Sequence, residues 1–294
     1  MRIVVFDVGG TFIKYALSDE NGHFSNQGKK QTPKESHEEF LQVIQDILDE
    51  FKDVDGMAFS LPGFINPDTG YISVGGSLRY HDDYSFVEKM SEHFHLPVSV
   101  QNDAKCAALA EVWKGDAKNH KNSVVVVFGT GVGGALIQDG NVYLGSHFMC
   151  SELSCVIRRD LNKYGFDATL GNCLSIPKLM QKISNVKGTR LNGEKVFELY
   201  KMKDQQVCEI IDSYFMAAAI EIFNFQCFYD PEIFYIGGGI SEEPIFVQGL
   251  QCAVNKFLER IPFKIPHIRI ESTTMKADAN LMGALYHYLK QQGN

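Results

Sequence analysis

Two glycine-bearing turns in this chain have the residue types and setting needed to hold phosphate groups. Each follows a short apolar strand, and they read Asp7-Val8-Gly9-Gly10-Thr11 and Gly129-Thr130-Gly131-Val132-Gly133-Gly134. Backbone N–H groups in such turns can approach a phosphate closely, because glycine has no Cβ to stand in the way. Since each turn leads into another strand, we expect two phosphate-gripping hairpins that face one another across a cleft, which suits phosphoryl transfer.

The second turn also matches the dinucleotide fingerprint G-x-G-x-x-G. That fingerprint requires a helix directly after the glycines and an acidic residue about 20 positions later. Here the glycines lead into Ala135-Leu136-Ile137-Gln138 and an Asp-Gly turn, so a hairpin is favoured over a dinucleotide site. A tight hairpin without any ligand remains the alternative for either turn taken alone.

Asp7 stands at the end of the first apolar strand, where a carboxylate is costly unless it has a partner. It could orient Mg²⁺ through water, since this hard cation keeps several waters when a protein binds it. The alternative is an Asp that only helps to form the turn before Gly9 and Gly10.

Asn102-Asp103 lies between a predicted strand, Pro97 to Gln101, and a predicted helix, Ala104 to Trp113. Ligands bind at such positions in open α/β sheets, and a carboxylate there could take a proton from an attacking hydroxyl group. The alternative for Asp103 is an N-cap of the helix.

Three glycines, Gly237-Gly238-Gly239, follow the predicted strand Ile233 to Ile236. They would permit close approach of a flat ligand, and the alternative is a tight strand-to-helix turn with no ligand. The next helix is expected near Ser241, with that residue as its N-cap and with Glu242 and Glu243 in its first turn.

The rest of the chain alternates strands and helices, which indicates an α/β fold. A length of 294 residues suits two domains. We expect a small α/β domain over residues 1–104, a large α/β domain over 105–278, and a C-terminal helix in 279–294 that packs back on the first. Helical periodicity or strand-like patterning also marks Arg2 to Phe6, Phe12 to Asp19, Glu38 to Phe51, Val54 to Leu61, Phe86 to Phe94, Ser123 to Phe128, Cys208 to Phe228 and Ala279 to Lys290.

Charge and cysteine content narrow the classes of protein. The chain has 28 Lys and Arg against 36 Asp and Glu, a net charge of −8, which argues against a nucleic-acid surface. No apolar run approaches the roughly 20 residues of a membrane span, and Asp7 interrupts the first one, so no signal peptide is expected. The seven cysteines are scattered. We therefore expect a reduced, cytoplasmic protein with no nucleic-acid or membrane partner.

Taken together and in order, these segments resemble the ROK sugar kinases. The resemblance implies an actin-like, hexokinase-type fold of two α/β domains, with ATP and Mg²⁺ in the cleft and transfer of the γ-phosphoryl to a sugar hydroxyl. Family members are often dimers, which implies a possible homodimer. The matching residues span nearly the whole chain: Asp7 to Thr11, Pro62-Gly63, Gln101 to Ala104, Gly129 to Gly134, Asp230-Pro231, Gly237 to Gly239 and Gly283-Ala284.

The resemblance also implies a role for individual residues. Asp103 corresponds to the catalytic base, and Asn102 and Glu152 correspond to sugar ligands, with Pro62, Gly63 and Gly76 on the same side. The phosphate and Mg²⁺ region corresponds to Asp7, Gly9, Gly10, Thr11, Lys14, Gly129, Thr130, Gly131 and Gly133, and the adenosine side to Gly237, Gly238 and Gly239.

The zinc cluster of the family is not kept. Cys155 stands where the family has a His that ligates zinc and faces the sugar, and Phe166 and Ala168 fall where two ligand cysteines would be. Cys173 is retained, whereas Ser175 replaces a Glu. Because a structural zinc site needs four ligands, we predict no structural zinc and expect both cysteines to be buried and inert.

In the family, the lost His and Glu lie near the anomeric end of the sugar, so a substituent could be accommodated there. The stretches Ser60 to Pro67 and Gly75 to Tyr80 look closest to the β-glucoside kinase branch, which implies phosphorylation of the C6 hydroxyl of a glucosyl unit, as in cellobiose. Arg79 and Tyr80 are either walls of a site for the second sugar or ordinary loop residues. The alternatives are a monosaccharide kinase for glucose, fructose or mannose, and a sugar-sensing ROK regulator without kinase activity.

Overall fold

The computed structural model describes residues 1–293 and divides the chain into two compact units. Unit 1 comprises Met1–Lys118, Asn141–Cys150 and Ala277–Asn294, and unit 2 comprises Asn119–Gly140 and Ser151–Lys276. The boundary expected after residue 104 falls inside a continuous helix, α3 (Asp103–Trp113). That helix belongs to unit 1, because it packs along α10 (Ala279–Gln291).

Unit 1 is built on a five-stranded sheet of order β3-β2-β1-β4-β8. The first three strands in the chain pair antiparallel, and β1, β4 and β8 pair parallel. A second, small sheet has the order β5-β6-β7. The strands are β1 (Ile3–Val8), β2 (Phe12–Ser18), β3 (Phe24–Gln31), β4 (Gly56–Leu61), β5 (Phe64–Asn66), β6 (Tyr71–Val74), β7 (Tyr84–Ser85) and β8 (Val98–Asn102), with β11 (Asn141–Tyr143) in the inserted segment.

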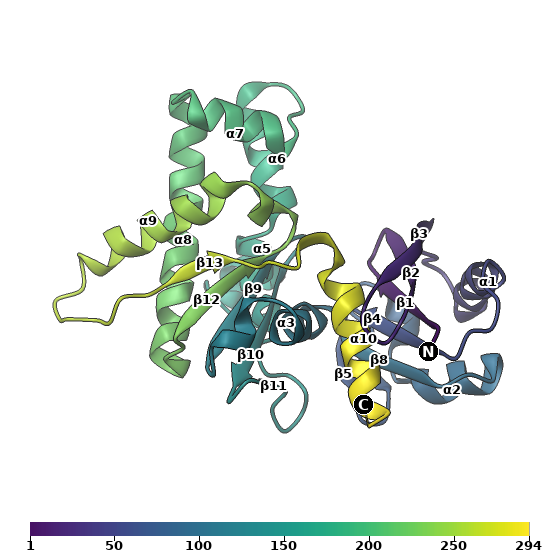
Figure 1. Cartoon of the computed structure of the whole chain (residues 1–294). Helices are drawn as coiled ribbons and strands as arrows, with labels where there is room; N and C mark the ends of the chain where they lie inside the picture. The colour runs from purple at the N-terminus through teal and green to yellow at the C-terminus, as the bar shows by residue number, and fades with distance from the viewer. Residues whose placement is uncertain (294) are drawn as a thin grey trace. The chain divides into compact units, whose positions relative to one another are not determined.

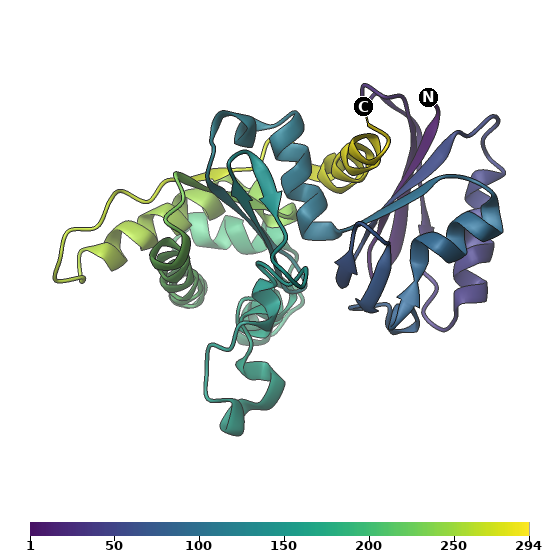
Figure 2. The ribbon, with the colours of Figure 1, turned by 90° about the horizontal axis from the view of Figure 1, so that it is seen from below.

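Helices cover both faces of the large sheet of unit 1. On one face, α1 (His37–Leu48) and α2 (Phe86–Phe94) bury their apolar residues against β1 and β4, and the rings of Phe6 and Phe59 stack there at 4.5 Å. On the other face, α3 and α10 pack on the alternate side chains of the same strands (Figures 1 and 2). Strands β1 and β4 therefore each contribute side chains to two hydrophobic cores, one on each face of the sheet, which explains their nearly continuous apolar sequences.

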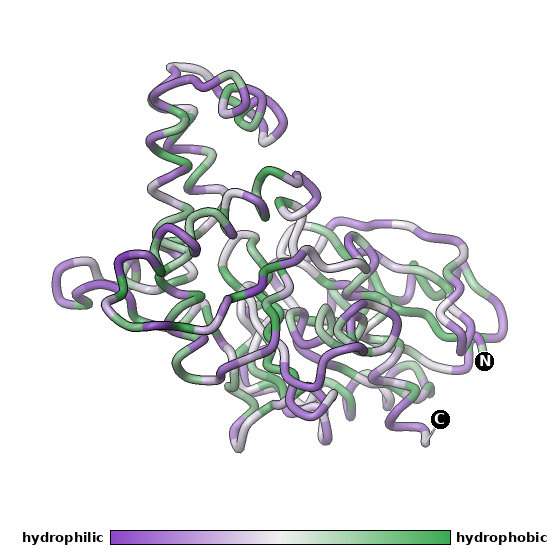
Figure 3. The backbone as a smooth tube through the Cα atoms, turned by 60° about the vertical axis from the view of Figure 1, so that its left-hand side comes forward, coloured by the Kyte–Doolittle hydropathy of each residue, from purple (hydrophilic) through white to green (hydrophobic). Residues whose placement is uncertain are grey.

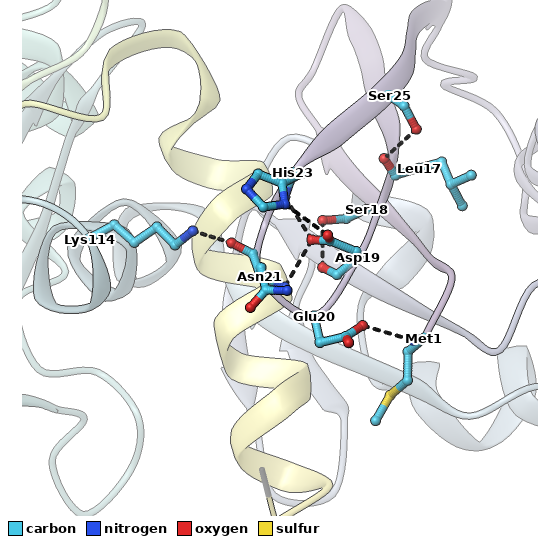
Figure 4. A network of polar contacts seen from close by, with 9 residues as sticks. All are labelled: Met1, Leu17, Ser18, Asp19, Glu20, Asn21, His23, Ser25 and Lys114. Atoms are coloured by element: carbon cyan, nitrogen blue, oxygen red, sulfur yellow. Dashed lines mark hydrogen bonds and ion pairs between the residues drawn. The ribbon is translucent and has the colours of Figure 1, made fainter.

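The turn between β2 and β3 of unit 1 is held by a compact polar network (Figure 4). Asp19 accepts hydrogen bonds from the backbone N–H groups of Asn21 and His23, both at 2.9 Å, and its other carboxylate oxygen lies 2.8 Å from His23 Nδ1. Gly22 has a φ of +76°, a left-handed conformation that glycine adopts readily. Lys114, the C-cap residue of α3, donates to the carbonyl of Asn21, so the turn is tied to the end of that helix.

Unit 2 also combines an antiparallel hairpin with parallel strands, but different helices surround its sheet. Its strands β9 (Ser123–Phe128) and β10 (Val132–Gln138) form an antiparallel pair, and β9, β12 (Ile233–Gly237) and β13 (Ile270–Ser272) pair parallel in the order β10-β9-β12-β13. The helices are α4 (Leu161–Tyr164), α5 (Leu170–Cys173), α6 (Ile176–Lys187), α7 (Gly193–Lys201), α8 (Gln205–Tyr229) and α9 (Pro244–Leu258).

Single-turn 3₁₀ helices fill several connections in both units. They are η1 (Arg79–His81), η2 (Asp116–Asn119), η3 (Leu153–Cys155), η4 (Gly165–Ala168), η5 (Gly239–Glu242) and η6 (Lys276–Asp278). Figure 3 shows the hydrophobic stretches gathered along the inner strands and helices of each unit, with hydrophilic residues on the outer turns. Among the described residues, none of the helices combines the length and apolar character that a membrane crossing would need.

The element limits correct two expectations about the glycine turns. Asp7 and Val8 belong to β1, and Val132 to Gly134 belong to β10, so both turns are shorter than the sequence indicates. Their main chains pair with the neighbouring strand, since Asp7 lies opposite Lys14 and Gly133 lies opposite Val127. The true turns are therefore residues 9–11 and 129–131.

Candidate active site

Asp7 is held by partners from three elements of unit 1. Its side chain is 14% exposed, and its Oδ1 accepts hydrogen bonds from Asn280 Nδ2 at 2.9 Å and from Ser60 Oγ at 3.3 Å. Its Oδ2 lies 3.7 Å from Lys14 Nζ. Strand register explains two of these partners, because Asp7 pairs with Lys14 on one side and with Ser60 on the other. The carboxylate is thus held in one orientation at the end of β1.

The turn after β1 is braced by Thr32, the residue that follows β3. Gly9 N–H donates to the Phe12 carbonyl at 3.0 Å, and Thr32 donates to the Gly9 carbonyl through its hydroxyl at 2.7 Å and to the Thr11 carbonyl through its N–H at 3.0 Å. A Cβ on Gly10 would stand 3.1 Å from Ser77 Oγ. The turn therefore presents its backbone beside the loop that contains Gly76.

Asn102 and Asp103 lie where β8 ends and α3 begins, but their local roles differ from the expectation. Asn102, rather than Asp103, is the N-cap: its Oδ1 accepts from the N–H groups of Ala104 and Lys105 at 3.0 and 3.2 Å. Asp103 is the first helical residue, and its Oδ1 accepts from Ala104 N–H at 2.7 Å. A carboxylate in the first turn is favoured by the helix dipole, so Asp103 is stabilised at this position without acting as the cap.

Four of the predicted sugar-side residues are brought together in unit 1. Asn102 Nδ2 donates to the Gly63 carbonyl at 2.9 Å. Gly63 has a φ of +116°, and a Cβ there would overlap the carbonyl oxygen of Val74. Gly76, with a φ of +61°, lies against Pro62 and Gly63. Both glycines are thus required by backbone conformation, and they bring this loop to the start of α3.

The thiol of Cys106 is affected by the charges of both candidate carboxylates of unit 1, Asp7 and Asp103. Its thiol is fully buried and donates to the Gln101 carbonyl at 3.8 Å. Burial raises its pKa well above the usual range, and the negative charges of Asp103 and Asp7 raise that pKa further, whereas a hydrogen bond with Ser60 lowers it. The thiol therefore stays protonated beneath the candidate site.

Arg79 has a partner within its own loop, and Tyr80 has one in the segment between β3 and α1. Arg79 forms an ion pair with Asp82 at 2.6 Å, and Asp82 also accepts from Gly75 N–H at 2.7 Å. Tyr80 donates its hydroxyl proton to the Pro33 carbonyl at 3.0 Å, and burial raises its pKa to about 12. These contacts give both residues a role in shaping the loop.

In unit 2, the glycine turn after β9 is held from two sides. Ser154 Oγ accepts from Val132 N–H at 2.9 Å and donates to the Val132 carbonyl at 3.1 Å. A Cβ on Gly131 would come within 2.6 Å of that hydroxyl, whereas a Cβ on Gly129 would meet nothing within 4 Å. From the other side, the first N–H of α6, that of Ile176, donates to the Gly129 carbonyl at 3.0 Å. Gly131 is thus needed for packing, while Gly129 and the exposed Thr130 face open space.

The three glycines at the end of β12, Gly237 to Gly239, have different roles. Gly238 has a φ of +89°, and a Cβ there would overlap the carbonyl of Phe128, the last residue of β9. A Cβ on Gly237 would come within 3.3 Å of Thr273 Cγ2, a tight contact, and one on Gly239 would meet nothing within 4 Å. Gly238 therefore brings the glycine segment directly beside the strand that leads to Gly129.

Ser241 is not the N-cap of the following helix. It lies in η5, and its hydroxyl donates to the Gly238 carbonyl at 2.8 Å. Helix α9 begins at Pro244, and Glu243 is its N-cap, with its carboxylate accepting from Ile245 N–H at 3.4 Å. Pro244 explains the shift, because proline is preferred in the first turn of a helix.

The segment that replaces the zinc cluster differs from expectation in its cysteines. Cys155 is exposed and Cys173 is partly exposed, so neither is the buried residue that we expected. Within residues 1–293, no group of three or more His, Cys, Asp or Glu side chains could hold a metal ion. An antiparallel bridge between Ile157 and Thr169 and an ion pair between Arg158 and Glu221 at 2.6 Å tie this segment down. Glu152 precedes η3, and its carbonyl accepts from Cys155 N–H at 3.0 Å.

Sequence reasoning missed three residues that hold the candidate groups in place: Asn280, Ser60 and Ser154. Asn280 gave a weak signal as a polar residue in the first turn of a largely apolar helix. Ser60 interrupts the apolar run of β4, and Ser154 stands where the aligned family segment has glycine. None of these signals identifies a partner, which only the paired strands and packed helices supply.

The duplicated arrangement defines the class of protein. In both units an antiparallel hairpin with a glycine turn continues into parallel strands with helices, and this is the actin-like fold of the hexokinase type. The chain belongs to the ROK family, because the family model described as "ROK family" matches residues 3–291.

Individual relatives cover the chain almost completely. A β-glucoside kinase of Listeria monocytogenes is 29% identical over 99% of both chains. An N-acetyl-D-glucosamine kinase of Mannheimia succiniciproducens is 28% identical, covering 90% of this chain and 92% of that one. The crystal structure of a ROK family protein from Streptococcus pneumoniae in complex with sucrose is 30% identical, with a TM-score of 0.86 over 100% of this chain and 99% of that one.

Proposed function

We propose that this protein is an ATP-dependent sugar kinase that phosphorylates the C6 hydroxyl of a glucosyl unit, preferably in β-glucosides such as cellobiose. The observation that carries the proposal is the arrangement at the start of α3. There Asp103 follows an Asn102 side chain that also holds the Gly63 carbonyl at 2.9 Å. A carboxylate and a glycine loop thus converge at the carboxyl end of a parallel strand, where α/β proteins bind ligands.

In this proposal, Asp103 accepts the proton of the attacking hydroxyl group. The hydrogen bond from Ala104 N–H at 2.7 Å fixes the orientation of its carboxylate. Asn102 has its Oδ1 engaged by two helix N–H groups, and one hydrogen of its Nδ2 is used by Gly63. The second hydrogen of that amide can donate to a sugar oxygen. Glu152 of unit 2 is proposed as a further sugar ligand, on the family resemblance.

The residues present fit a nucleotide and its metal ion. Gly129 and Gly239 leave open space where a Cβ would stand, and Gly238 brings the two segments together by its contact with Phe128. Backbone N–H groups of residues 129–131 would hold phosphate oxygens, and residues 237–239 would accommodate the adenosine side. Asp7, with Lys14 beside it, would hold Mg²⁺ through water. When bound, that ion neutralises charge on the phosphate groups.

The choice of β-glucosides rests on two observations. The β-glucoside kinase of Listeria monocytogenes matches the chain from end to end. Around the proposed anomeric end, Cys155 and Ser175 replace a His and a Glu, and Ser175 is occupied as the N-cap of α6, accepting from Lys178 N–H at 3.4 Å. Removing two long polar ligands leaves room for a substituent on the sugar.

Phosphate transfer across a panel of acceptors tests the substrate. Cellobiose and an aryl β-glucoside should be turned over with a higher kcat/KM than glucose, fructose, mannose and N-acetylglucosamine. A preference for a monosaccharide would replace the β-glucoside proposal, and an absence of transfer to every acceptor would favour a regulator without kinase activity.

The role of Asp103 is tested by Asp103→Asn. This change should lower kcat by about 10²–10⁴-fold, the usual contribution of a general base, while sugar binding is largely kept. Asp53→Asn is the matched control, because Asp53 is an exposed turn residue with a φ of +53°, a conformation that Asn also adopts. A kcat within tenfold of the wild type in the Asp103 variant would contradict the assignment.

The proposed absence of structural zinc is tested by elemental analysis of the purified protein. We expect less than stoichiometric zinc, and we expect a chelator to leave the thermal midpoint unchanged. Stoichiometric zinc that is lost together with stability would contradict this proposal.

A further inference from the structure

A cavity of about 320 Å³ in unit 2 has a strongly basic lining that the proposed kinase reaction does not use. It lies between the first half of α6, the middle of α8 and the segment that precedes α4. Its charged lining residues are Arg158, Arg159, Lys178 and Lys182, and no carboxylate lines it. This grouping is notable in a chain whose net charge is −8.

Two of the four cations are neutralised by carboxylates beside the cavity. Arg158 Nε donates to Glu221 at 2.6 Å, and Lys178 Nζ donates to Asp167 at 2.6 Å. Arg159 and Lys182 form no ion pair with any residue in 1–293, and Arg159 lies over the ring of Tyr164 with a separation of 5.6 Å. Four cations against two carboxylates leave an excess of two positive charges, which matches a dianion.

The interior wall offers fixed hydrogen-bond donors rather than only mobile surface charges. The Arg158 side chain is 16% exposed, and its guanidinium is held by Glu221 and, through Nη2, by the Ala217 carbonyl at 3.0 Å. Its Nη1 remains to donate to a ligand, in the planar arrangement that suits phosphate oxygens. Ser213 adds a hydroxyl group at the same wall.

The position of Lys178 is electrostatically unfavourable, and a bound anion would offset this effect. It lies in the first turn of α6, which contains no acidic residue. The positive end of the helix dipole disfavours a cation at that position and favours an anion. Because Lys182 follows one turn later on the same wall, the helix presents two cations to the cavity from its N-terminal half.

We propose that this cavity binds a small phosphate dianion, either free phosphate or the phosphate group of a monoester. A volume of about 320 Å³ is at the lower end of the range for small-molecule sites, about 300–1,000 Å³, and matches a compact ligand. The apolar residues Leu179, Ile210 and Ala217 line the remaining wall and would contact the carbon skeleton of a monoester. None of residues 129–131, the proposed phosphate turn, lines the cavity, although the first N–H of α6 donates to the Gly129 carbonyl.

The test compares binding of inorganic phosphate and of glucose 6-phosphate to three proteins at constant ionic strength. The pocket variant is Arg159→Gln with Lys182→Met, and the control is Arg260→Gln with Lys256→Met. The control removes the same charges from exposed positions of unit 2 that are not in the cavity lining. All four side chains are exposed, so both variants are expected to fold, and thermal unfolding without ligand checks this.

The pocket variant should bind phosphate at least tenfold more weakly than the wild type, and the control should stay within twofold. Phosphate should also raise the thermal midpoint of the wild type and the control, but not of the pocket variant. Tighter binding of glucose 6-phosphate than of phosphate, lost in the same variant, would identify the monoester as the ligand, whereas equal affinity would identify free phosphate. Equal phosphate binding by all three proteins, or none by the wild type, would overturn the proposal.

Discussion

Asn280 Nδ2 donates a hydrogen bond to Asp7 Oδ1 at 2.9 Å, joining the first turn of α10 to the end of β1 across 273 positions of sequence. The same carboxylate oxygen accepts from Ser60, and the other lies 3.7 Å from Lys14. The C-terminal helix therefore does more than complete the core of unit 1, because it also orients the carboxylate that we propose for the metal ion.

Replacing Asn280 with Ala should weaken the use of Mg–ATP. Without the amide donor, Asp7 loses one of the hydrogen bonds that orient it, and we expect kcat/KM for the nucleotide to fall about 10–100-fold, as is typical when a partner of a metal ligand is removed. Ala is a good helix former, so stability should change little. Steady-state kinetics with varied Mg–ATP measure the effect.

Asn119→Ala is the control for this prediction, since Asn119 is exposed and has no side-chain hydrogen bond within the described chain. A value of kcat/KM for Asn280→Ala within twofold of the control would show that the contact with Asp7 is not needed for nucleotide use.

Gly283→Ala should destabilise unit 1. A Cβ at Gly283 would overlap the carbonyl oxygen of Cys106, so α3 and α10 can pack as they do only with glycine at this position. We expect a loss of about 2 kcal/mol or more in the free energy of unfolding, measured in urea. Gly193→Ala, at the first position of α7 where a Cβ meets nothing within 4 Å, should stay within about 0.5 kcal/mol of the wild type. Equal stability of the two variants would refute the close-packing argument.

The two glycines of the second turn should separate stability from nucleotide binding. Gly131→Ala would push against Ser154 Oγ at 2.6 Å and should lower the free energy of unfolding by about 1–3 kcal/mol. Gly129→Ala meets open space and should leave stability unchanged, yet it should weaken nucleotide binding, because its methyl group would stand where a phosphate approaches. Titration with a non-hydrolysable ATP analogue measures affinity. Unchanged affinity in Gly129→Ala would argue against a phosphate at this turn.

His81 should make the protein less stable in mild acid. Its ring is buried among Phe40, Phe86 and Tyr84, and neither ring nitrogen has a hydrogen-bond partner within residues 1–293. Burial, with a smaller contribution from the charge of His37, lowers its pKa from 6.5 to about 3. Between these values the unfolded chain binds a proton that the folded chain does not, so the free energy of unfolding rises with pH and falls as pH drops from 6.5 towards 3.

His81→Phe should remove this part of the pH dependence. The difference in the free energy of unfolding between pH 7.5 and pH 5 should shrink by roughly 2 kcal/mol, because about 1.5 pH units lie between the unfolded pKa and pH 5. Urea unfolding at the two pH values measures it, with the exposed His93→Gln as the control. His287, whose pKa is also lowered by burial, to about 4, stays in both variants and contributes acid sensitivity of the same sign. An unchanged pH difference in His81→Phe would contradict the prediction.

Much of the fold could be predicted from short-range patterns in the sequence. Helix α2 has the predicted limits Phe86–Phe94, and α10 ends one residue beyond the predicted segment. β2 and β3 form a hairpin through Asn21 and Gly22, and Gly22 supplies a positive φ that few other residues adopt. The order of these elements, with their glycine turns, was also enough to indicate the family. Such features depend on residues a few positions apart, so the sequence displays them directly.

The sequence was less informative where neighbouring residues compete for one role. Asn102 and Asp103 can each cap a helix, and the structure gives the cap to Asn102. Ser241 and Glu243 compete similarly, and Pro244 decides for Glu243. Propensities separate such neighbours poorly, because the free-energy difference between adjacent N-caps is small.

By itself, the sequence determined the α/β class, the two glycine turns and the candidate base Asp103. Only the tertiary structure decided which residues surround them: Asn280 and Ser60 on Asp7, Ser154 against Gly131, and the grouping of Arg158, Arg159, Lys178 and Lys182 around one cavity. The physical reason is that strand register and helix packing bring together residues that lie as far as 273 positions apart in the sequence. The spacing of residues along the chain does not reveal such long-range contacts.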